Sequence, residues 1–130
     1  MQEKQFQRLP DAELDVMLVL WEAGKEMKTS ALLEELNQNR SWSMSTLQAL
    51  LARLSERGFV RAETRGRLKY YSPTVSEEDY RNRETKTFFE RFYKNSFKDL
   101  FAGLVNTRSI TKEDIRELEE MLRKEGKQSD

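Results

Sequence analysis

The sequence predicts a mainly α-helical fold in two parts, with one β-hairpin between them. Apolar residues recur every three or four positions through most of the 130 residues, which is the period of an α-helix. Two short runs rich in β-forming residues, FVRAET and RLKYYSP, flank the turn Arg65-Gly66-Arg67. The expected order is three helices, a hairpin and three further helices, with a domain boundary between residues 1–75 and 76–130.

The first two helices are indicated by apolar spacing and by the residues at their ends. Pro10 suits the start of the first helix, and Gly24 suits its end. Its apolar residues are spaced i, i+3, i+4, i+7: Leu14, Met17, Leu18 and Trp21. Thr29 or Ser30 is expected to cap the second helix. The apolar face of this helix consists of Leu32, Leu33 and Leu36.

The third helix is predicted to begin at the cap Ser43 and to end before Gly58. Four leucines at the same helical spacing form its apolar face: Leu47, Leu50, Leu51 and Leu54. Pro73 closes the second strand of the hairpin that follows. Trp21 and Trp42 are expected in the core. Of Tyr70 and Tyr71, which alternate along a strand, one is expected in the core and the other free to offer its hydroxyl.

The C-terminal part is predicted to be helical throughout. Ser76 and the acidic residues after it suit a helix start, because carboxylates favour the positive end of the helix dipole. Asn95-Ser96 is the expected break inside the aromatic stretch. Thr111 is expected to cap the last helix, whose apolar face contains Ile115, Leu118, Met121 and Leu122.

Composition excludes several classes of function. The chain has no cysteine and no histidine, so it can form no disulfide and no thiolate metal site, and it lacks the commonest general base. We therefore expect neither an enzyme nor a cofactor. The longest apolar run, from Val16 to Trp21, is too short for a membrane span. The first ten residues contain no apolar signal segment, and we expect a cytoplasmic protein that does not engage a membrane.

Charge is distributed unevenly along a chain whose formal net charge is zero. Residues 10–39 carry seven acidic and two basic side chains, whereas residues 40–72 carry seven basic and two acidic side chains. Six of the seven basic residues in 40–72 are arginines, which suit forked contacts with phosphates and bases. A local basic stripe is compatible with DNA binding and equally with a solvated surface segment.

Three helices followed by a hairpin, within about 65 residues, are typical of a winged helix-turn-helix DNA-binding domain. The segments LPDAELDVMLVLWEAG, STLQALLARLSERGFV and YYSP, and further on SEEDY, TKTFFERFY and SITKEDIRELEEML, resemble the penicillinase-repressor (BlaI/MecI/CopY) family of bacterial transcriptional repressors. The resemblance extends from Leu9 to about Leu122. It implies a winged DNA-binding domain followed by a helical dimerisation region.

The third helix would lie in the major groove, and the hairpin would act as the wing. The candidate DNA-binding residues on the helix are Ser43, Ser45, Thr46, Gln48, Ala49 and Arg53. Those on the wing are Arg61, Arg65, Arg67 and Lys69. Gln48 can bond an adenine edge in forked geometry, and Ala49 can contact a thymine methyl. Alternatively, Ser45 and Thr46 serve only the first turn of the helix, and the charges only keep an edge hairpin soluble.

The C-terminal helices carry more aromatic residues than their own length of chain can cover. We expect an intermolecular core, and hence a homodimer, from Phe88, Phe89, Phe92, Phe97, Leu100, Phe101, Leu104, Ile115, Leu118 and Leu122. The alternative is that these helices fold back on the winged domain as one monomeric core.

The resemblance also implies how such repressors are released from DNA. In drug-resistance members, a membrane sensor-protease pathway leads to cleavage at an Asn-Phe pair in the C-terminal half. Alignment places Gly103-Leu104 at that position, so the matching dipeptide is absent. The copper-responsive branch has a cysteine-rich tail, and the absence of cysteine excludes that branch.

The sequence therefore predicts a sequence-specific transcriptional repressor that binds a palindromic double-stranded DNA operator as a homodimer. It resembles regulators of β-lactam resistance genes. The alternative is a winged-helix protein–protein interaction module, in which the basic hairpin meets an acidic protein.

Overall fold

The computed structural model describes residues 8–129, and the first seven residues of the expected signal-free N-terminus lie outside that range. The element order is α1 (Asp11–Ala23), β1 (Met27–Lys28), α2 (Thr29–Leu36), α3 (Met44–Glu56), β2 (Val60–Arg65), β3 (Leu68–Pro73), α4 (Glu77–Tyr93), α5 (Phe97–Asn106) and α6 (Lys112–Ser129). The mainly helical winged fold is confirmed.

Most helix ends are fixed by the residues expected from the sequence. Gly24 ends α1 in the left-handed region, with φ of 66°, where glycine has no steric penalty. The hydroxyls of Ser43, Ser76, Ser96 and Thr111 accept backbone N–H bonds at the starts of α3, α4, α5 and α6.

The expected cap of α2 is wrong. Lys28 occupies the N-cap position in an extended conformation and makes no side-chain cap bond, while Thr29 is already helical. The reason is that Met27 and Lys28 form the short strand β1, which the sequence analysis missed. The hydroxyl of Thr29 is directed instead to the carbonyl oxygen of Lys69, at 3.4 Å.

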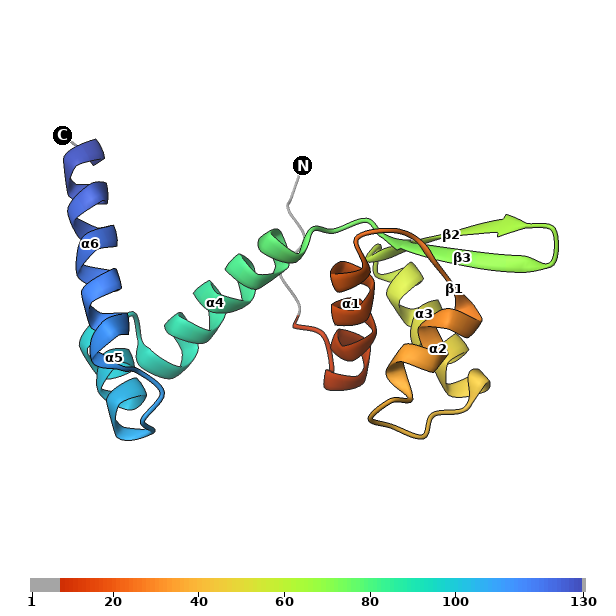
Figure 1. Cartoon of the computed structure of the whole chain (residues 1–130), viewed down its shortest axis with the longest axis horizontal. Coiled ribbons are helices and arrows are strands. Elements are labelled where there is room, and N and C mark those ends of the chain that lie inside the picture. The colour runs from red at the N-terminus through yellow and green to blue at the C-terminus, as the bar shows by residue number, and fades with distance from the viewer. Residues whose placement is uncertain (1–7, 130) are drawn as a thin grey trace. The chain divides into compact units, whose positions relative to one another are not determined.

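The three strands form an antiparallel sheet in the order β1-β3-β2. β2 and β3 form the predicted hairpin, which extends beyond the helices of the N-terminal part (Figure 1). The central strand β3 pairs with both neighbours, whereas β1 contributes only two residues. This arrangement places the wing beside α2 and α3.

The core is formed by α1, α2 and α3 with the base of the sheet. All four predicted leucines of α3 are buried, as are Leu32 and Leu36 of α2. Trp21 and Trp42 are half-buried against this core, and Tyr71 is the tyrosine of the pair that enters it.

The buried stripe of α1 is shifted by one position along the chain from the predicted stripe, and the two share only Met17. Glu13, Val16, Met17 and Leu20 are buried, whereas Leu18 is 44% exposed. The true stripe has the same i, i+3, i+4, i+7 spacing but begins at a glutamate. Glu13 is accommodated because its Oε1 accepts a hydrogen bond from Arg57 Nη1 at 2.8 Å.

The chain divides into two compact units, residues 1–84 and residues 85–130. The division falls within α4, later than the boundary expected after residue 75, because Tyr80 belongs to the first unit. The Tyr80 side chain is buried, its hydroxyl accepts the Leu9 N–H bond at 2.8 Å, and its ring contacts those of Trp21 and Phe59.

The second unit has no interior of its own in a single chain. No side chain described between residues 85 and 126 is buried. Its aromatic residues contact one another locally, as in the pairs Phe88–Phe92 and Phe97–Phe101. The predicted interface residues are accordingly exposed or half-buried.

Candidate nucleic-acid interface

Helix α3 presents a small, polar face on the side opposite its buried leucines. The Ser43 hydroxyl begins the helix by accepting the Thr46 N–H bond at 3.1 Å. The exposed residues of the helix include Ser45, Thr46, Gln48, Ala49, Ala52 and Arg53. A face of this kind allows a helix to approach the floor of a DNA major groove closely.

The hydroxyls at the start of α3 are bound to one another. Ser43 Oγ lies 3.0 Å from both Ser45 Oγ and Thr46 Oγ1. First-turn helix chemistry is therefore present: the Ser43 hydroxyl uses its one donor and two acceptor positions here, whereas the hydroxyls of Ser45 and Thr46 retain capacity for a further partner. Within the described part of the chain, by contrast, no hydrogen bond involves the Gln48 side-chain amide.

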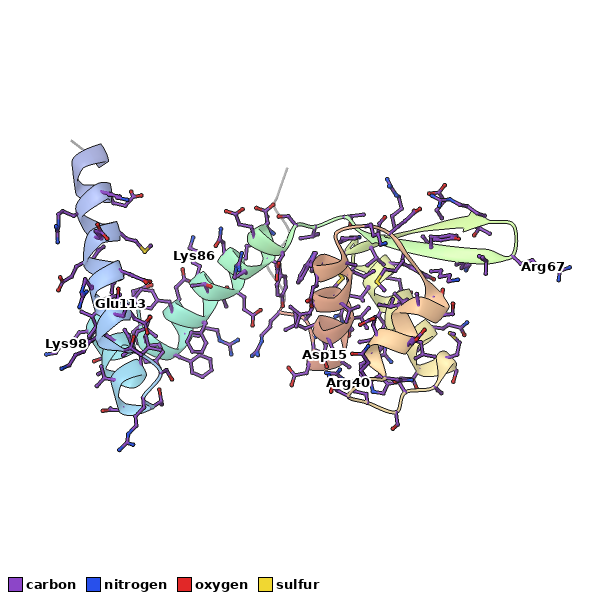
Figure 2. All side chains as sticks on the ribbon, in the orientation of Figure 1. Asp15, Arg40, Arg67, Lys86, Lys98 and Glu113 are labelled. Carbon is purple, nitrogen blue, oxygen red and sulfur yellow. The ribbon has the colours of Figure 1, made fainter. Side chains whose placement is uncertain are left out.

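The turn between α2 and α3 is held by two side chains. The Asn37 side chain bonds both the N–H and the carbonyl of Trp42, each at 2.9 Å. The Arg40 guanidinium lies over the Trp42 ring and pairs with Asp15 of α1 at 2.6 Å, and Figure 2 shows Asp15 and Arg40 next to one another. These contacts fix the orientation in which α3 begins.

An open groove of about 370 Å³ lies where α2, α3 and the wing meet. It is lined by Lys28, Thr29, Ser30, Met44, Gln48, Arg67, Leu68 and Lys69. The groove brings together three residues that the sequence analysis selected, namely Gln48, Arg67 and Lys69. The further lining residues are Lys28 of the unpredicted strand β1, Thr29 and Ser30 at the start of α2, Met44 and Leu68.

The groove is basic. Lys28, Arg67 and Lys69 line it, and none of the described residues lining it is acidic. Figure 2 shows Arg67 at the tip of the hairpin, pointing away from the helices. Arg67 and Lys69 form no ion pair within residues 8–129, so their charges are available to an anionic partner.

The strand register separates the predicted wing residues into two groups. Lys69 pairs with Thr64 and lies on the same face as the buried Tyr71, because side chains alternate along a strand. Arg61 and Arg65 lie on the opposite face, and neither lines the groove. Arg53 is exposed on α3 and does not line the groove either.

The described residues contain no group of three or more His, Cys, Asp or Glu side chains that could hold a metal ion. None of the helices within the described range is long and apolar enough to cross a membrane.

A family model described as "Penicillinase repressor" matches residues 9–124. The chain belongs to the penicillinase repressor family. The match includes the winged domain and the helices that follow it, and it confirms the resemblance expected from the sequence.

Individual members of the penicillinase repressor family are similar to the chain over nearly its whole length. The penicillinase repressor of Bacillus licheniformis is 30% identical over 119 residues, which cover 92% of each chain. The methicillin resistance regulatory protein MecI of Mammaliicoccus sciuri is 28% identical over 116 residues, which cover 89% of this chain and 94% of MecI.

Two solved structures share the fold of the winged part. The solution structure of the DNA-binding domain of the repressor BlaI has a TM-score of 0.52. That of monomeric Bacillus licheniformis BlaI in complex with the blaP half-operator has a TM-score of 0.50. Each is 35% identical to this chain, covers 60% of it, and is itself covered to 94%.

The second unit of this penicillinase repressor family member exposes half of the predicted interface residues. Phe88, Phe92, Phe97, Leu104 and Leu122 are exposed, and Phe89, Leu100, Phe101, Ile115 and Leu118 are half-buried. Gly103 and Leu104, which replace the expected cleavage pair, lie inside α5. A Cβ atom at Gly103 would lie 3.0 Å from Tyr93 Oη, so a larger residue there would shift the end of the Tyr93 side chain by a few tenths of an ångström.

Proposed function

We propose that this chain is a cytoplasmic, non-enzymatic transcriptional repressor that binds a palindromic double-stranded DNA operator as a homodimer. Each winged domain inserts α3 into the major groove of one half-site. The observation that carries the proposal is the basic groove, in which Gln48 of the predicted recognition helix lies beside Arg67 and Lys69 of the wing.

The division of roles follows from chemistry. Gln48 and Ala49 read base edges, because a free amide matches adenine and a methyl group matches the thymine methyl. Ser43, Ser45 and Thr46 lie at the N-terminus of α3, where hydroxyls and backbone N–H groups suit a phosphate. Arg53, Arg67 and Lys69 bind the DNA backbone. The structure of the related BlaI in complex with the blaP half-operator supports DNA binding by the winged part.

The homodimer is supported by the second unit. A single winged domain offers too few phosphate contacts for tight specific binding at physiological salt, and two domains on a palindrome double them. The side chains described between residues 85 and 126 include no buried one, although many are apolar. Pairing with a second copy buries them, as obligate interfaces do.

Selection of binding sites from a random DNA library tests the proposal. The selected sequences should contain two inverted half-sites whose centres are about one or two helical turns apart. Recovery of unrelated sequences, with no shared half-site, would contradict sequence-specific repression and would favour the protein-interaction alternative.

A further inference from the structure

The Arg65 side chain is held by its own chain through four hydrogen bonds. Its Nη1 and Nη2 donate to the two carboxylate oxygens of Glu26 at 2.5 and 2.9 Å. Its Nε and Nη2 donate to the two carboxylate oxygens of Glu63 at 3.3 and 3.0 Å. The guanidinium carbon lies 4.7 Å from the centre of the Tyr70 ring.

These contacts connect β2 with the segment that precedes β1, two parts of the sheet that do not pair with each other. Glu63 and Arg65 lie on β2, Tyr70 lies on β3, and Glu26 immediately precedes β1. Since the strand order is β1-β3-β2, Arg65 reaches from one edge strand across the central strand to the segment entering the other edge. β1 continues directly into α2, whose first residues line the basic groove.

The same cluster is a poor site for a DNA phosphate. Most of the Arg65 N–H groups already donate to two carboxylates, which a phosphate would have to displace. The Arg65 side chain also lies on the sheet face opposite Lys69. Its hydrogen bond and its positive charge lower the pKa of the Glu63 carboxyl, so this carboxylate stays charged at neutral pH.

We propose that Arg65, Glu26, Glu63 and Tyr70 form a latch that fixes the hairpin relative to the start of α2. The latch positions Arg67 and Lys69 against the DNA backbone, while Arg65 itself contacts no phosphate. This inference rests on the proposed DNA-binding function and changes which wing arginine binds DNA.

The Glu26→Gln variant distinguishes two roles of the carboxylates: holding Arg65 back from DNA, or fixing the wing through Arg65. The two roles predict changes of operator affinity in opposite directions. Glutamine preserves the shape of the side chain but makes the protein more positive by one charge. If the carboxylates merely held Arg65 back from DNA, the variant would bind the operator more tightly. The latch predicts that it binds about fivefold more weakly, because the wing loses its fixed orientation. The matched control is Glu34→Gln on α2, an exposed carboxylate without an ion pair in the described residues; it should bind as tightly as the unaltered chain or slightly more tightly.

The salt dependence of binding separates a positioning residue from a phosphate contact. Arg67→Gln should remove one phosphate contact. The slope of log affinity against log salt should therefore become shallower by ~0.9. Arg65→Gln should weaken operator binding with the slope unchanged, and Glu26→Gln should add nothing to it in the double variant. Tighter binding by Glu26→Gln, or a reduced slope for Arg65→Gln, would overturn the latch.

Hydrogen exchange of the hairpin amides tests the latch without DNA. In Glu26→Gln and Arg65→Gln, the amides of β2 and β3 should exchange about fivefold faster than in Glu34→Gln. Unchanged exchange would refute the latch whatever the DNA result. If the unaltered chain shows no preference for any DNA, the proposed function fails by itself. Faster exchange would then still establish that these residues fix the hairpin.

Discussion

Gln48 and Arg67 line the same groove but differ in what a DNA duplex offers them. Gln48→Ala should weaken operator binding by ~1–3 kcal/mol and leave binding to unrelated DNA unchanged, because it removes a contact with a base edge. Arg67→Ala should weaken binding to all sequences nearly equally, because phosphates carry no sequence information. Titrations of both variants with operator and scrambled duplexes measure this difference. Identical behaviour of the two variants would refute the division of roles.

The Tyr80 hydroxyl is the partner of a buried backbone group. Tyr80→Phe keeps the ring but leaves the Leu9 N–H without an acceptor, and should lower the free energy of unfolding by ~1–3 kcal/mol. Urea unfolding measures the loss, with Tyr70→Phe as a control whose hydroxyl makes no hydrogen bond within the described chain. Equal stability of Tyr80→Phe and the unaltered protein would show that the bond contributes nothing.

The same residue gives stability a dependence on pH. Burial is the main cause that raises the Tyr80 pKa above its usual value of 10.0, so the folded state favours the neutral phenol. The stability that the neutral Tyr80 phenol contributes to the fold is fully present below pH 10. It is lost as the pH rises through the higher pKa of the folded state. The stability difference between Tyr80→Phe and the unaltered protein should therefore shrink above pH 10.

Helices α1 and α3 are joined by a buried ion pair. Glu13 is 2% exposed, and the Arg57 side chain that pairs with it is 38% exposed. Arg57→Ala should cost about 2 kcal/mol of stability, because it leaves a buried carboxylate without its partner. The double variant Glu13→Leu with Arg57→Ala should recover most of this loss, as measured by urea unfolding. A double variant no more stable than Arg57→Ala would contradict this explanation.

Elements whose signals are local were predictable from the sequence. Gly24 ends α1 through its left-handed backbone, and Ser43 begins α3 through its side-chain hydroxyl. Both roles depend on local structure and could be predicted without tertiary contacts. The strand β1 was not predictable, because two residues carry no periodicity and its pairing with β3 is a tertiary event. Glu13 was missed for a related reason: a charged residue enters a core only when a distant partner compensates it.

The sequence predicted which types of residue form the candidate site. It predicted only in part which of these residues come together in the fold. Gln48, Arg67 and Lys69 were chosen for their chemistry, and the fold brings them to one groove. Arg65 was chosen for the same reason, yet it is bound by Glu26, a residue distant in sequence. Composition could not separate Arg65 from Arg67, because only the fold brings Glu26 to Arg65 and leaves Arg67 in the turn between the strands.

At the scale of the whole molecule, the proposed homodimer rests on the apolar side chains of the second unit. Leu118→Asp should split the proposed dimer and remove most of the operator affinity, because it places a charge within the apolar face of α6. Sedimentation equilibrium measures the first effect, and DNA titration measures the second. Glu119→Ala, at an exposed position of the same helix, should remain dimeric. A Leu118→Asp variant that stays dimeric would place the interface elsewhere.

The most direct test of the account is binding of the protein to the DNA upstream of its own gene. Fluorescence anisotropy at two salt concentrations, against a scrambled duplex of the same composition, measures affinity, preference and salt dependence together. A sequence-specific repressor should bind the native DNA tightly and much more strongly than the scrambled duplex, and this binding should weaken steeply with salt. Weak binding, equal for both duplexes, would contradict the repressor function and make the basic groove a docking surface for an acidic protein.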